Sequence, residues 1–410
     1  MRLGAIGAAL LILAGVISGG SGLILAGVLL GLTLVVQSVW SRYGLRALVY
    51  ERHLSARRVR WGERIELELV VRNAKALPLP WLRIDDSVTA GAEIDGEHLP
   101  PSAHRGYDLL RSMWSVGWFE RVTRRFSIVG GRRGVYRFTT AELRVADLFG
   151  RENRSEERAI QTTYRVVPRI VAVRSAMTRS PAVGATRPVT GFVEEPSLFA
   201  GVRPYQAGDH PRRIHWKATA RLGRPVSRRY DAAREQAVVL AVDMQTVPGP
   251  TWMLNWDDDL LEGLTVAAIS LARSWIEDGI SVGLAVNAFS DRPQRSIFVV
   301  PSATPGQMAA IADQLAATSP YPSLPFTALL ADLARRAPLG CSIVALSCGD
   351  PTGFAPVLRR LTLHGYRASH ASFGPGATAI SARARALGVP SVAYRLDPDW
   401  ETADALERVG

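Results

Sequence analysis

Cysteine is scarce in this 410-residue chain, which has only Cys341 and Cys348. The two lie seven positions apart, on what the pattern predicts to be one strand and its exit. That spacing fits neither a zinc ligand set nor a disulfide, so we expect two small buried residues. The sequence also lacks a P-loop, a dinucleotide fingerprint, a nucleophile elbow and a zinc-protease motif. We therefore expect a protein that is not an enzyme, with no catalytic residue, no cofactor and no bound metal.

Acidic residues are in the minority, because 37 Asp and Glu stand against 49 Lys and Arg and the net charge is +12. The surplus is Arg rather than Lys, and the planar guanidinium group favours bidentate contacts with carboxylates or phosphates. The composition therefore indicates an acidic or polyanionic partner.

Charge is almost absent from the N-terminal part of the chain. Residues 3–17 and 23–40 are two apolar runs, separated by the Gly/Ser-rich residues 18–22. The second run reaches the roughly 18 residues that a spanning helix needs, whereas the first is short and needs the polar loop residues to complete its span. We predict that residues 1–47 form a transmembrane helical hairpin.

Basic residues flank this hairpin on one side only, with Arg2 before it and Arg42 and Arg46 after it. Positive-inside logic then places both termini in the cytoplasm. The prediction is a multi-pass protein of the inner (plasma) membrane with cytoplasmic soluble domains. A cleaved signal peptide over the first run is the alternative. It is disfavoured because the n-region has one Arg, no Ala-x-Ala site follows, and the second run would remain as an anchor.

Residues 48–174 show a two-residue period that no long amphipathic helix interrupts. Apolar residues from Ile65 to Val71 alternate with Glu66, Glu68 and Arg72, which is typical of a half-buried antiparallel strand. We predict a β-sandwich-like domain, of a kind that more often positions or binds than catalyses. Its other predicted strands are 82–87, 123–129, 135–140 and 160–167, its turns 73–80 and 130–134, and its long loop 91–106.

Residues 236–410 alternate between apolar strands and helices, which predicts an α/β domain with a mostly parallel sheet covered on both faces. Thr304 is the expected cap of the helix that follows it. The predicted strands are 237–242, 280–287, 296–300, 341–347, 367–373 and 391–396. The helices are 260–278, 305–317, 327–336, 354–364 and 377–387, and residues 400–409 continue the alternation.

The connecting residues 175–235 contain the most distinctive stretch of the chain. Residues 174–196 are rich in Ala, Thr, Pro and Gly and indicate a linker. Residues 201–230 then concentrate eight Arg or Lys side chains around a Gly-Asp turn. Asp209 is a candidate N-cap, and with Pro211 in the first turn it predicts a basic helix through about Arg221.

This segment closely resembles the signature of a bacterial family called domain of unknown function 58. The family has an Arg-x-Tyr-x-x-Gly-Asp element, followed by Arg, Ile and Trp and then by Ala-Arg. The matching positions are Arg203, Tyr205, Gly208, Asp209, Arg213, Ile214, Trp216, Ala220 and Arg221. Residues 133–136, 147–150 and 167–169 resemble the run-in to that signature, so the resemblance extends over roughly 50–400.

The resemblance implies a membrane-anchored protein with a β-rich domain and a von Willebrand factor A-like domain, often encoded beside a MoxR-type AAA+ ATPase. In such A-like domains a metal-ion-dependent adhesion site is built from Asp-x-Ser-x-Ser, a Thr and a later Asp. Here Asp243 is present, but Gln245 and Val247 replace the hydroxyls and Cys348 replaces the second carboxylate, with Thr327 as the third element. These are too few oxygen ligands for a hard cation, so we expect a degenerate site.

The signature segment has two interpretations. In the structural one, Arg213, Trp216 and Arg221 fasten the segment to the last domain, and Asp209 accepts capping and Arg hydrogen bonds. In the functional one, the cationic surface docks an acidic partner. His215 has no Ser, Cys or carboxylate paired with it by a recognisable motif, so we expect it to pack or to form hydrogen bonds.

The leading functional hypothesis is a non-enzymatic membrane-anchored adaptor or assembly factor, working with a MoxR-type AAA+ ATPase or its client. The alternative is a binding module for polyanions, either anionic lipid headgroups or nucleic acid, through the Arg-rich residues 121–137 and 203–229. Nucleic acid is the less favoured of these, because Tyr136, Tyr205 and Trp216 are expected to pack rather than to stack on bases. An enzyme with an unrecognised site is a third possibility.

Overall fold

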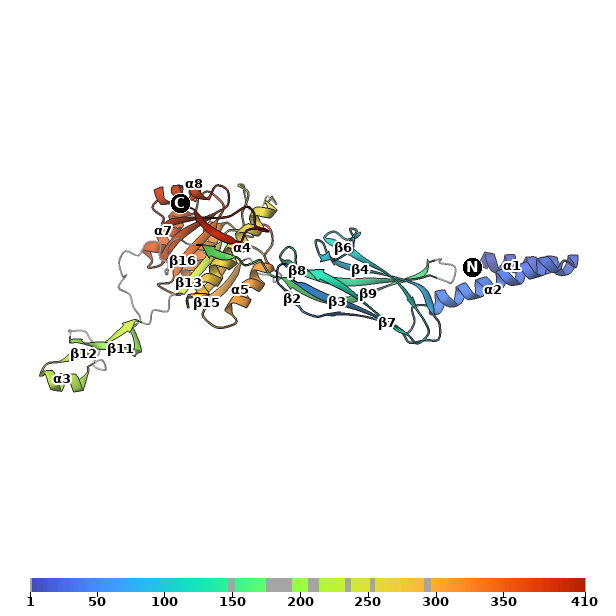
Figure 1. The fold of residues 1–410 in the computed structure, drawn as a ribbon, viewed down its shortest axis with the longest axis horizontal. Coiled ribbons are helices and arrows are strands. Elements are labelled where there is room, and N and C mark those ends of the chain that lie inside the picture. The colour runs from blue at the N-terminus through green and yellow to red at the C-terminus, as the bar shows by residue number, and fades with distance from the viewer. Residues whose placement is uncertain are drawn as a thin grey trace. The chain divides into compact units, whose positions relative to one another are not determined.

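A computed structural model describes residues 2–146, 152–174, 194–205, 214–232, 237–250, 255–290 and 296–409. The chain divides into two compact units between Arg169 and Ile170. The first unit contains two helices and a strand-rich domain, and the second contains an α/β domain. Figure 1 shows the elements of each unit.

Two antiparallel helices, α1 (Arg2–Ser18) and α2 (Ser21–Tyr43), open the first unit. Their backbones pack closely at glycines: a Cβ on Gly27 would lie 2.9 Å from the carbonyl oxygen of Ala8, and one on Gly15 would lie 2.7 Å from the nitrogen of Ile24. Small residues permit this approach between apolar helices. Among the described helices, only α2 is both long and apolar enough to cross a membrane. The span predicted for the first apolar run, residues 3–17, therefore stays a prediction.

Two antiparallel sheets and a short parallel pairing form the strand-rich domain, with strand orders β1-β3-β7-β5 and β2-β9-β8-β4-β6. Side chains of both sheets, including Leu67, Phe138 and Tyr164, are buried in one core. This two-sheet arrangement agrees with the sandwich-like prediction, but β1 and β6 were not predicted, and β5 lies inside the expected loop 91–106. The strands are β1 (Leu48–Leu54), β2 (Arg58–Val59), β3 (Arg64–Asn73), β4 (Leu79–Thr89), β5 (Glu93–Ile94), β6 (Tyr107–Val116), β7 (Arg121–Val129), β8 (Gly134–Ala146) and β9 (Glu152–Val166).

A buried ion pair links the two sheets of this domain. Arg52 of β1 and Asp86 of β4 are fully buried, and Nη1 of Arg52 lies 3.3 Å from Oδ1 of Asp86. The hydroxyl of Tyr50 donates to the other carboxylate oxygen, and Nη2 of Arg52 donates to the carbonyl oxygen of Ile160. Burial raises the pKa of Asp86 to about 6, although Arg52 and Tyr50 act in the opposite direction. The core therefore contains a charge that needs its partner.

The second unit has an eight-stranded sheet in the order β10-β19-β18-β17-β16-β13-β14-β15. Only the β14–β15 and β18–β19 pairs are antiparallel, so the prediction of a mostly parallel sheet is confirmed. The strands are β10 (Ala172–Arg174), β13 (Ala237–Val242), β14 (Ser281–Val286), β15 (Ile297–Ser302), β16 (Ser342–Ser347), β17 (Arg367–Phe373), β18 (Ser391–Leu396) and β19 (Ala405–Val409).

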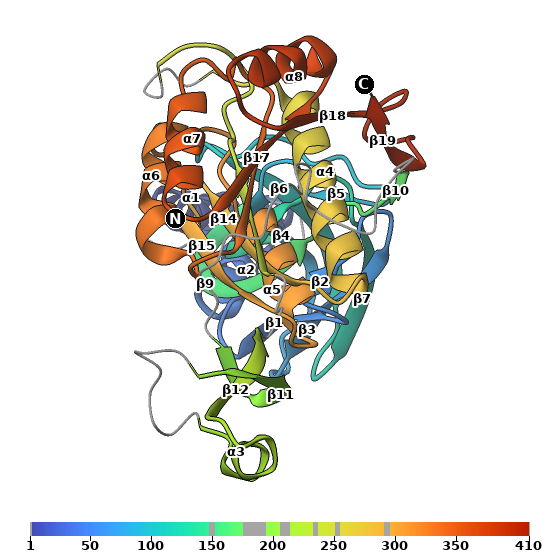
Figure 2. The same ribbon diagram turned by 90° about the vertical axis from the view of Figure 1, so that its left-hand side faces the viewer.

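Helices cover both faces of this sheet, as Figure 2 shows for α4 and α5 on one side and α6 and α7 on the other. Val239 and Ala241 of β13 pack in one cluster with Leu329 of α6 and Leu358 of α7. Because side chains alternate along a strand, Val238, Leu240 and Val242 lie on the opposite face. The helices are α4 (Asp258–Glu277), α5 (Gln307–Ala316), α6 (Phe326–Arg336), α7 (Ala355–Leu363) and α8 (Ala377–Ala386).

Two local predictions in this unit were wrong. Residues 400–409 do not continue the alternation with a helix, since 405–409 form β19, which pairs with both β18 and β10. The hydroxyl of Thr304 does not cap α5; Gly306 is the N-cap without a side-chain bond, and Thr304 accepts the N–H of Gln307 through its backbone oxygen. At residues 405–409 the strand pairing available only in the folded chain outweighed the local pattern.

Candidate functional site

The candidate site lies where β13 ends, at the carboxyl edge of the parallel sheet. Asp243 follows β13 and Asn287 follows the neighbouring strand β14, so the two side chains meet. Oδ1 of Asp243 accepts from Nδ2 of Asn287 at 2.7 Å and from the N–H of Gln245 at 3.2 Å. Asn287 was not predicted as a site residue, although its position directly after a strand was a usable signal.

Asn287 also limits what this site can hold. Its Nδ2 donates to the carbonyl oxygen of Leu324 at 3.3 Å, and its Oδ1 accepts from the N–H of Met244 at 2.8 Å. The amide therefore presents N–H groups to the Asp243 carboxylate, where an adhesion-type site would present a cation. No group of three or more His, Cys, Asp or Glu among the described residues could hold a metal ion.

Burial at this site favours the protonated forms of Asp243 and Cys348. Burial raises the pKa of Asp243 to about 6, while the bonds from Asn287 and Gln245 lower it. Burial also raises the pKa of the Cys348 thiol, and the negative charges of Asp243 and Asp257 raise it further. Cys348 thus lies within electrostatic range of Asp243, and as a protonated thiol it is a poor nucleophile and a poor metal ligand.

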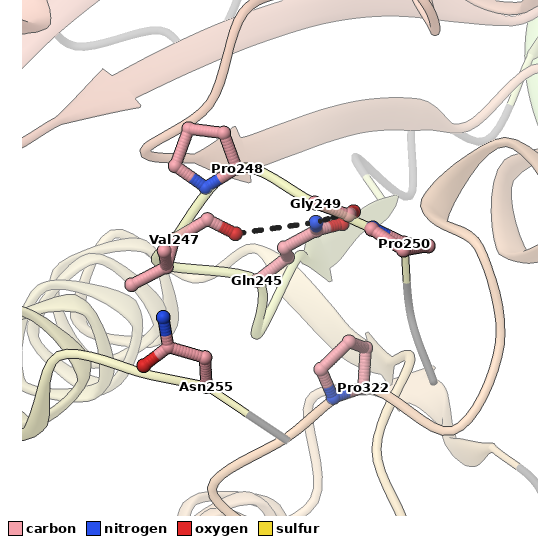
Figure 3. A pocket seen from close by; sticks show the side chains of 7 residues that line it. All are labelled: Gln245, Val247, Pro248, Gly249, Pro250, Asn255 and Pro322. Carbon is pink, nitrogen blue, oxygen red and sulfur yellow. Dashed lines mark hydrogen bonds between the residues drawn. The ribbon is translucent and has the colours of Figure 1, made fainter. Parts of the chain in front are cut away.

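Gln245 and Val247 form a loop rather than a ligand pair. Nε2 of Gln245 donates to the carbonyl oxygens of Val247, at 3.2 Å, and of Gly249, and this closes the turn (Figure 3). Thr327 lies in the first turn of α6 and is half-buried. A small pocket beside the turn is lined by Gln245, Val247, Pro248, Gly249, Pro250, Asn255 and Pro322.

Among the described residues, no titratable side chain lines this pocket, and prolines form much of its rim. Aromatic rings continue the surface nearby: the Tyr321 ring centroid lies 5.9 Å from that of Trp256 and 6.3 Å from that of Phe289. Apolar rings and backbone carbonyls suit the packing of a peptide side chain rather than acid–base chemistry.

A buried Ser–His–Ser chain is the other polar cluster in the sheet. Nε2 of His370 lies 3.0 Å from the hydroxyl of Ser347, and Nδ1 lies 3.0 Å from that of Ser391. All three residues are buried, and burial lowers the pKa of His370 to about 4. A neutral imidazole that is hidden from solvent and bonded to two hydroxyls connects three strands, so we interpret it as structural.

The signature segment forms a small unit of its own secondary structure. Strands β11 (Glu194–Pro204) and β12 (Val226–Ala232) pair antiparallel. Arg203 lies in β11, and Tyr205 directly follows this strand. Helix α3 (Trp216–Leu222) lies between them in sequence. Gly208, Asp209 and Arg213 lie outside the described residues.

Helix α3 begins later than the sequence predicted. Its N-cap is His215, whose Nδ1 accepts the N–H of Ala218 at 3.1 Å, so the helix does not start at Asp209. His215 is therefore a hydrogen-bonding residue, as expected. The helix ends at Gly223, which adopts a left-handed φ of 65°. A helix starts where a side-chain acceptor satisfies one of its free N–H groups. In α3 this acceptor is the imidazole nitrogen of His215 instead of a carboxylate oxygen.

Trp216 is largely exposed within this segment. Its exposed fraction is 69%, and that of Leu222 is 51%. Lys217, Ala220, Arg221 and Arg224 are exposed too, and α3 contains no buried residue. The helix is held to β12 through Thr219, whose hydroxyl accepts the N–H of Val226 at 3.2 Å. The segment therefore displays a surface that is both aromatic and basic.

Two comparisons find sequence similarity between this chain and known proteins. Residues 201–332 match the family described as protein of unknown function DUF58. A 247-residue region is 23% identical to the uncharacterized protein YeaD of Bacillus subtilis (strain 168), covering 59% of this chain and 56% of that protein. The match thus spans about half the length of this curated relative.

Solved structures resemble the chain only loosely. The CARDB domain of a Pyrococcus furiosus protein, in complex with di-metal ions, aligns with a TM-score of 0.21 and 17% identity over 29% of this chain and 87% of that one. A β-glucosidase from Listeria innocua in complex with glucose aligns with a TM-score of 0.17 and 13% identity over 29% of this chain and 16% of that one. Neither likeness supports a functional argument. What the comparisons do show is similarity to DUF58 proteins, over the signature segment and the first part of the α/β domain.

Proposed function

We propose that this protein is a non-enzymatic, membrane-anchored adaptor or assembly factor, with its soluble domains in the cytoplasm. Its α/β domain is A-like with a degenerate metal site, and its partner is a MoxR-type AAA+ ATPase or the client of one. The observation that carries the proposal is the exposure of Trp216 beside Lys217, Arg221 and Arg224. Aromatic and Arg residues are the side chains that most often dominate binding at protein interfaces.

The sheet edge supports the same proposal. Asp243 is satisfied by Asn287, and the adjoining pocket is lined by Gln245 and prolines rather than by a catalytic constellation. Domains that keep such an edge without a metal can still bind a segment of a partner by packing. Helix α2 supports the anchor, because it is long and apolar enough to span a bilayer.

Charge reversal on α3 tests the adaptor. The variant Lys217→Glu, Arg221→Glu, Arg224→Glu should leave thermal stability within about 0.5 kcal/mol of the parent, because these side chains are exposed. It should slow association with a MoxR-type AAA+ ATPase by roughly tenfold or more, through lost electrostatic complementarity. Biolayer interferometry with full-length protein in nanodiscs measures the rate. Trp216→Ala should weaken the complex without lowering stability.

Its matched control reverses three exposed arginines of the α/β domain, Arg359, Arg367 and Arg385. The control changes the net charge equally, so a non-specific effect of charge would slow both variants alike. Equal association rates for the α3 variant, the control and the parent would show that α3 is not the docking surface.

The polyanion hypothesis keeps one specific observation in its favour. Trp216 is solvent-exposed rather than packed, which removes part of the ground on which nucleic acid was less favoured, whereas Tyr136 is buried. An exposed ring between basic side chains also suits stacking on bases. The salt dependence of binding separates the two functions. For phosphate binding, the logarithm of the affinity falls linearly with the logarithm of the salt concentration, with a slope of about −0.7 for each neutralised phosphate on single strands. A packed protein complex is less sensitive.

A further inference from the structure

Two large apolar side chains are displayed on the turn that joins β6 to β7. Trp118 is 70% exposed and Phe119 is 72% exposed. Phe119 has a φ of 52°, which few residues other than glycine adopt. Its N–H donates to the carbonyl oxygen of Lys75 at 3.1 Å, so a neighbouring loop holds this conformation in place. An aromatic side chain kept exposed on an uncommon backbone indicates a surface that binds something.

Hydrogen bonds connect this aromatic turn, residues 117–120, to the end of α2. Nδ2 of Asn73 donates to the carbonyl oxygens of Gly117, at 2.6 Å, and of Leu77, at 2.9 Å. Nε1 of Trp40, near the end of α2, donates to the carbonyl oxygen of Pro78 at 3.1 Å. The aromatic turn, the loop 74–78 and the end of α2 are thus one connected end of the strand-rich domain (Figure 1).

The position of Trp40 gives the level of this end relative to a bilayer. The apolar run of α2 finishes at Trp40, and tryptophan at the end of a spanning helix lies among the lipid headgroups. The carbonyl oxygen that Trp40 contacts belongs to the loop that also holds Phe119. Trp81, which is 50% exposed, follows three residues after Pro78. The aromatic turn is therefore held beside the end of α2, the end that a membrane-spanning α2 would place at the headgroups.

Charge around the aromatic turn fits an anionic surface. Arg72 of β3 and Arg121 of β7 are directly opposite in the register, and both are exposed. Like charges that face each other across a strand pair are unfavourable unless an anion lies between or above them. Arg42 and Arg46 are exposed next to the end of α2. The acid of the turn, Glu120, accepts the N–H of Gly117, so its carboxylate is directed back onto the turn.

We propose that the aromatic turn, together with Trp81, inserts into the headgroup region of the bilayer that holds α2, where Arg72 and Arg121 contact anionic phospholipids. This second attachment fixes the orientation of the strand-rich domain on the membrane, since a single helix would leave it free to swing. The proposal rests on the membrane anchor of the proposed function. It concerns a surface distinct from α3.

Site-specific fluorescence tests this contact in full-length protein. An environment-sensitive nitrobenzoxadiazole label is attached to Phe119→Cys in a background with Cys341→Ala and Cys348→Ala, and the protein is reconstituted into phosphatidylcholine–phosphatidylglycerol vesicles. We expect blue-shifted emission that brominated lipid quenches and aqueous iodide does not. The matched control label at Glu97→Cys, exposed at the opposite end of the same domain, should be quenched by iodide only. Arg72→Gln with Arg121→Gln, or vesicles of phosphatidylcholine alone, should reduce the lipid quenching at position 119.

A third label, at Leu29→Cys in the middle of α2, separates the two possible failures. If lipid quenches the label at position 29 while positions 119 and 97 respond alike to iodide, α2 is inserted and the aromatic turn is not a lipid contact. If lipid does not quench the label at position 29, both the anchor and this inference are wrong.

Discussion

Two buried aspartates, one in each unit, are stabilised in different ways. Asp86 and Asp243 are both nearly inaccessible, and burial raises the pKa of each to about 6. Asp86 lies between two sheets and has a guanidinium partner, Arg52, whereas Asp243 lies at a sheet edge and has an amide partner, Asn287. A charge in the core needs an opposite charge, while one at an edge can be held by neutral donors. Only the second arrangement resembles a ligand site.

The largest expected effect is on the ion pair. Arg52→Met leaves the Asp86 carboxylate buried without its cation and should lower the free energy of unfolding by about 3–5 kcal/mol. Urea unfolding of the full-length protein in detergent measures the loss. The double variant Arg52→Met, Asp86→Leu removes both charges and should recover most of the stability. A single variant as stable as the parent would contradict the account of this pair.

The pH dependence of stability should distinguish Asp243 from an ordinary carboxylate. Because its folded pKa is raised from 3.8 to about 6, the folded state holds the proton more tightly. The contribution of Asp243 to stability is therefore fully present below about pH 4 and is lost as the pH rises through 6. Between these limits the parent should lose about 3 kcal/mol relative to Asp243→Asn, which does not titrate.

Asp350→Asn is the matched control for this comparison. Asp350 is exposed, and its hydrogen bonds from Thr352 lower its pKa, so its contribution has the opposite sign. Thermal melts at a series of pH values compare the three proteins. Parallel profiles for the parent and Asp243→Asn would mean that Asp243 titrates normally in the folded state.

The smallest expected effect is that of added cations. Millimolar Mg²⁺ or Mn²⁺ should leave the melting temperature of the parent unchanged, because the Asn287 amide already satisfies Asp243. Binding with a thousandfold excess over the dissociation constant would add about 4 kcal/mol by mass action. The variant Gln245→Ser, Val247→Ser, Cys348→Asp restores the missing oxygen ligands and should gain a cation-dependent rise. A rise in the parent that Asp243→Ala abolishes would overturn the degenerate-site interpretation.

The alternation of strands and helices in residues 236–396 could be predicted, since period and flanking turns fix each element locally. The start of α3 could not, because several residues can cap a helix and only the fold decides which one does. Trp216 shows the same limit. Its place in the signature predicted packing, yet no apolar surface packs around it in the described residues of its segment. Burial depends on neighbours that a local pattern does not contain.

The sequence by itself determined the apolar N-terminal run, the strand-rich and α/β halves, and the presence of Gln245 and Val247, which carry no hydroxyl or carboxylate, after Asp243. All of these follow from residue type and short-range spacing. The tertiary structure alone decided that Asn287 meets Asp243, that Arg52 pairs with Asp86, and that Phe119 lies beside the end of α2. The members of each pair are separated by between 34 and 79 residues, so strand register and loop packing, which depend on the whole core, bring them together.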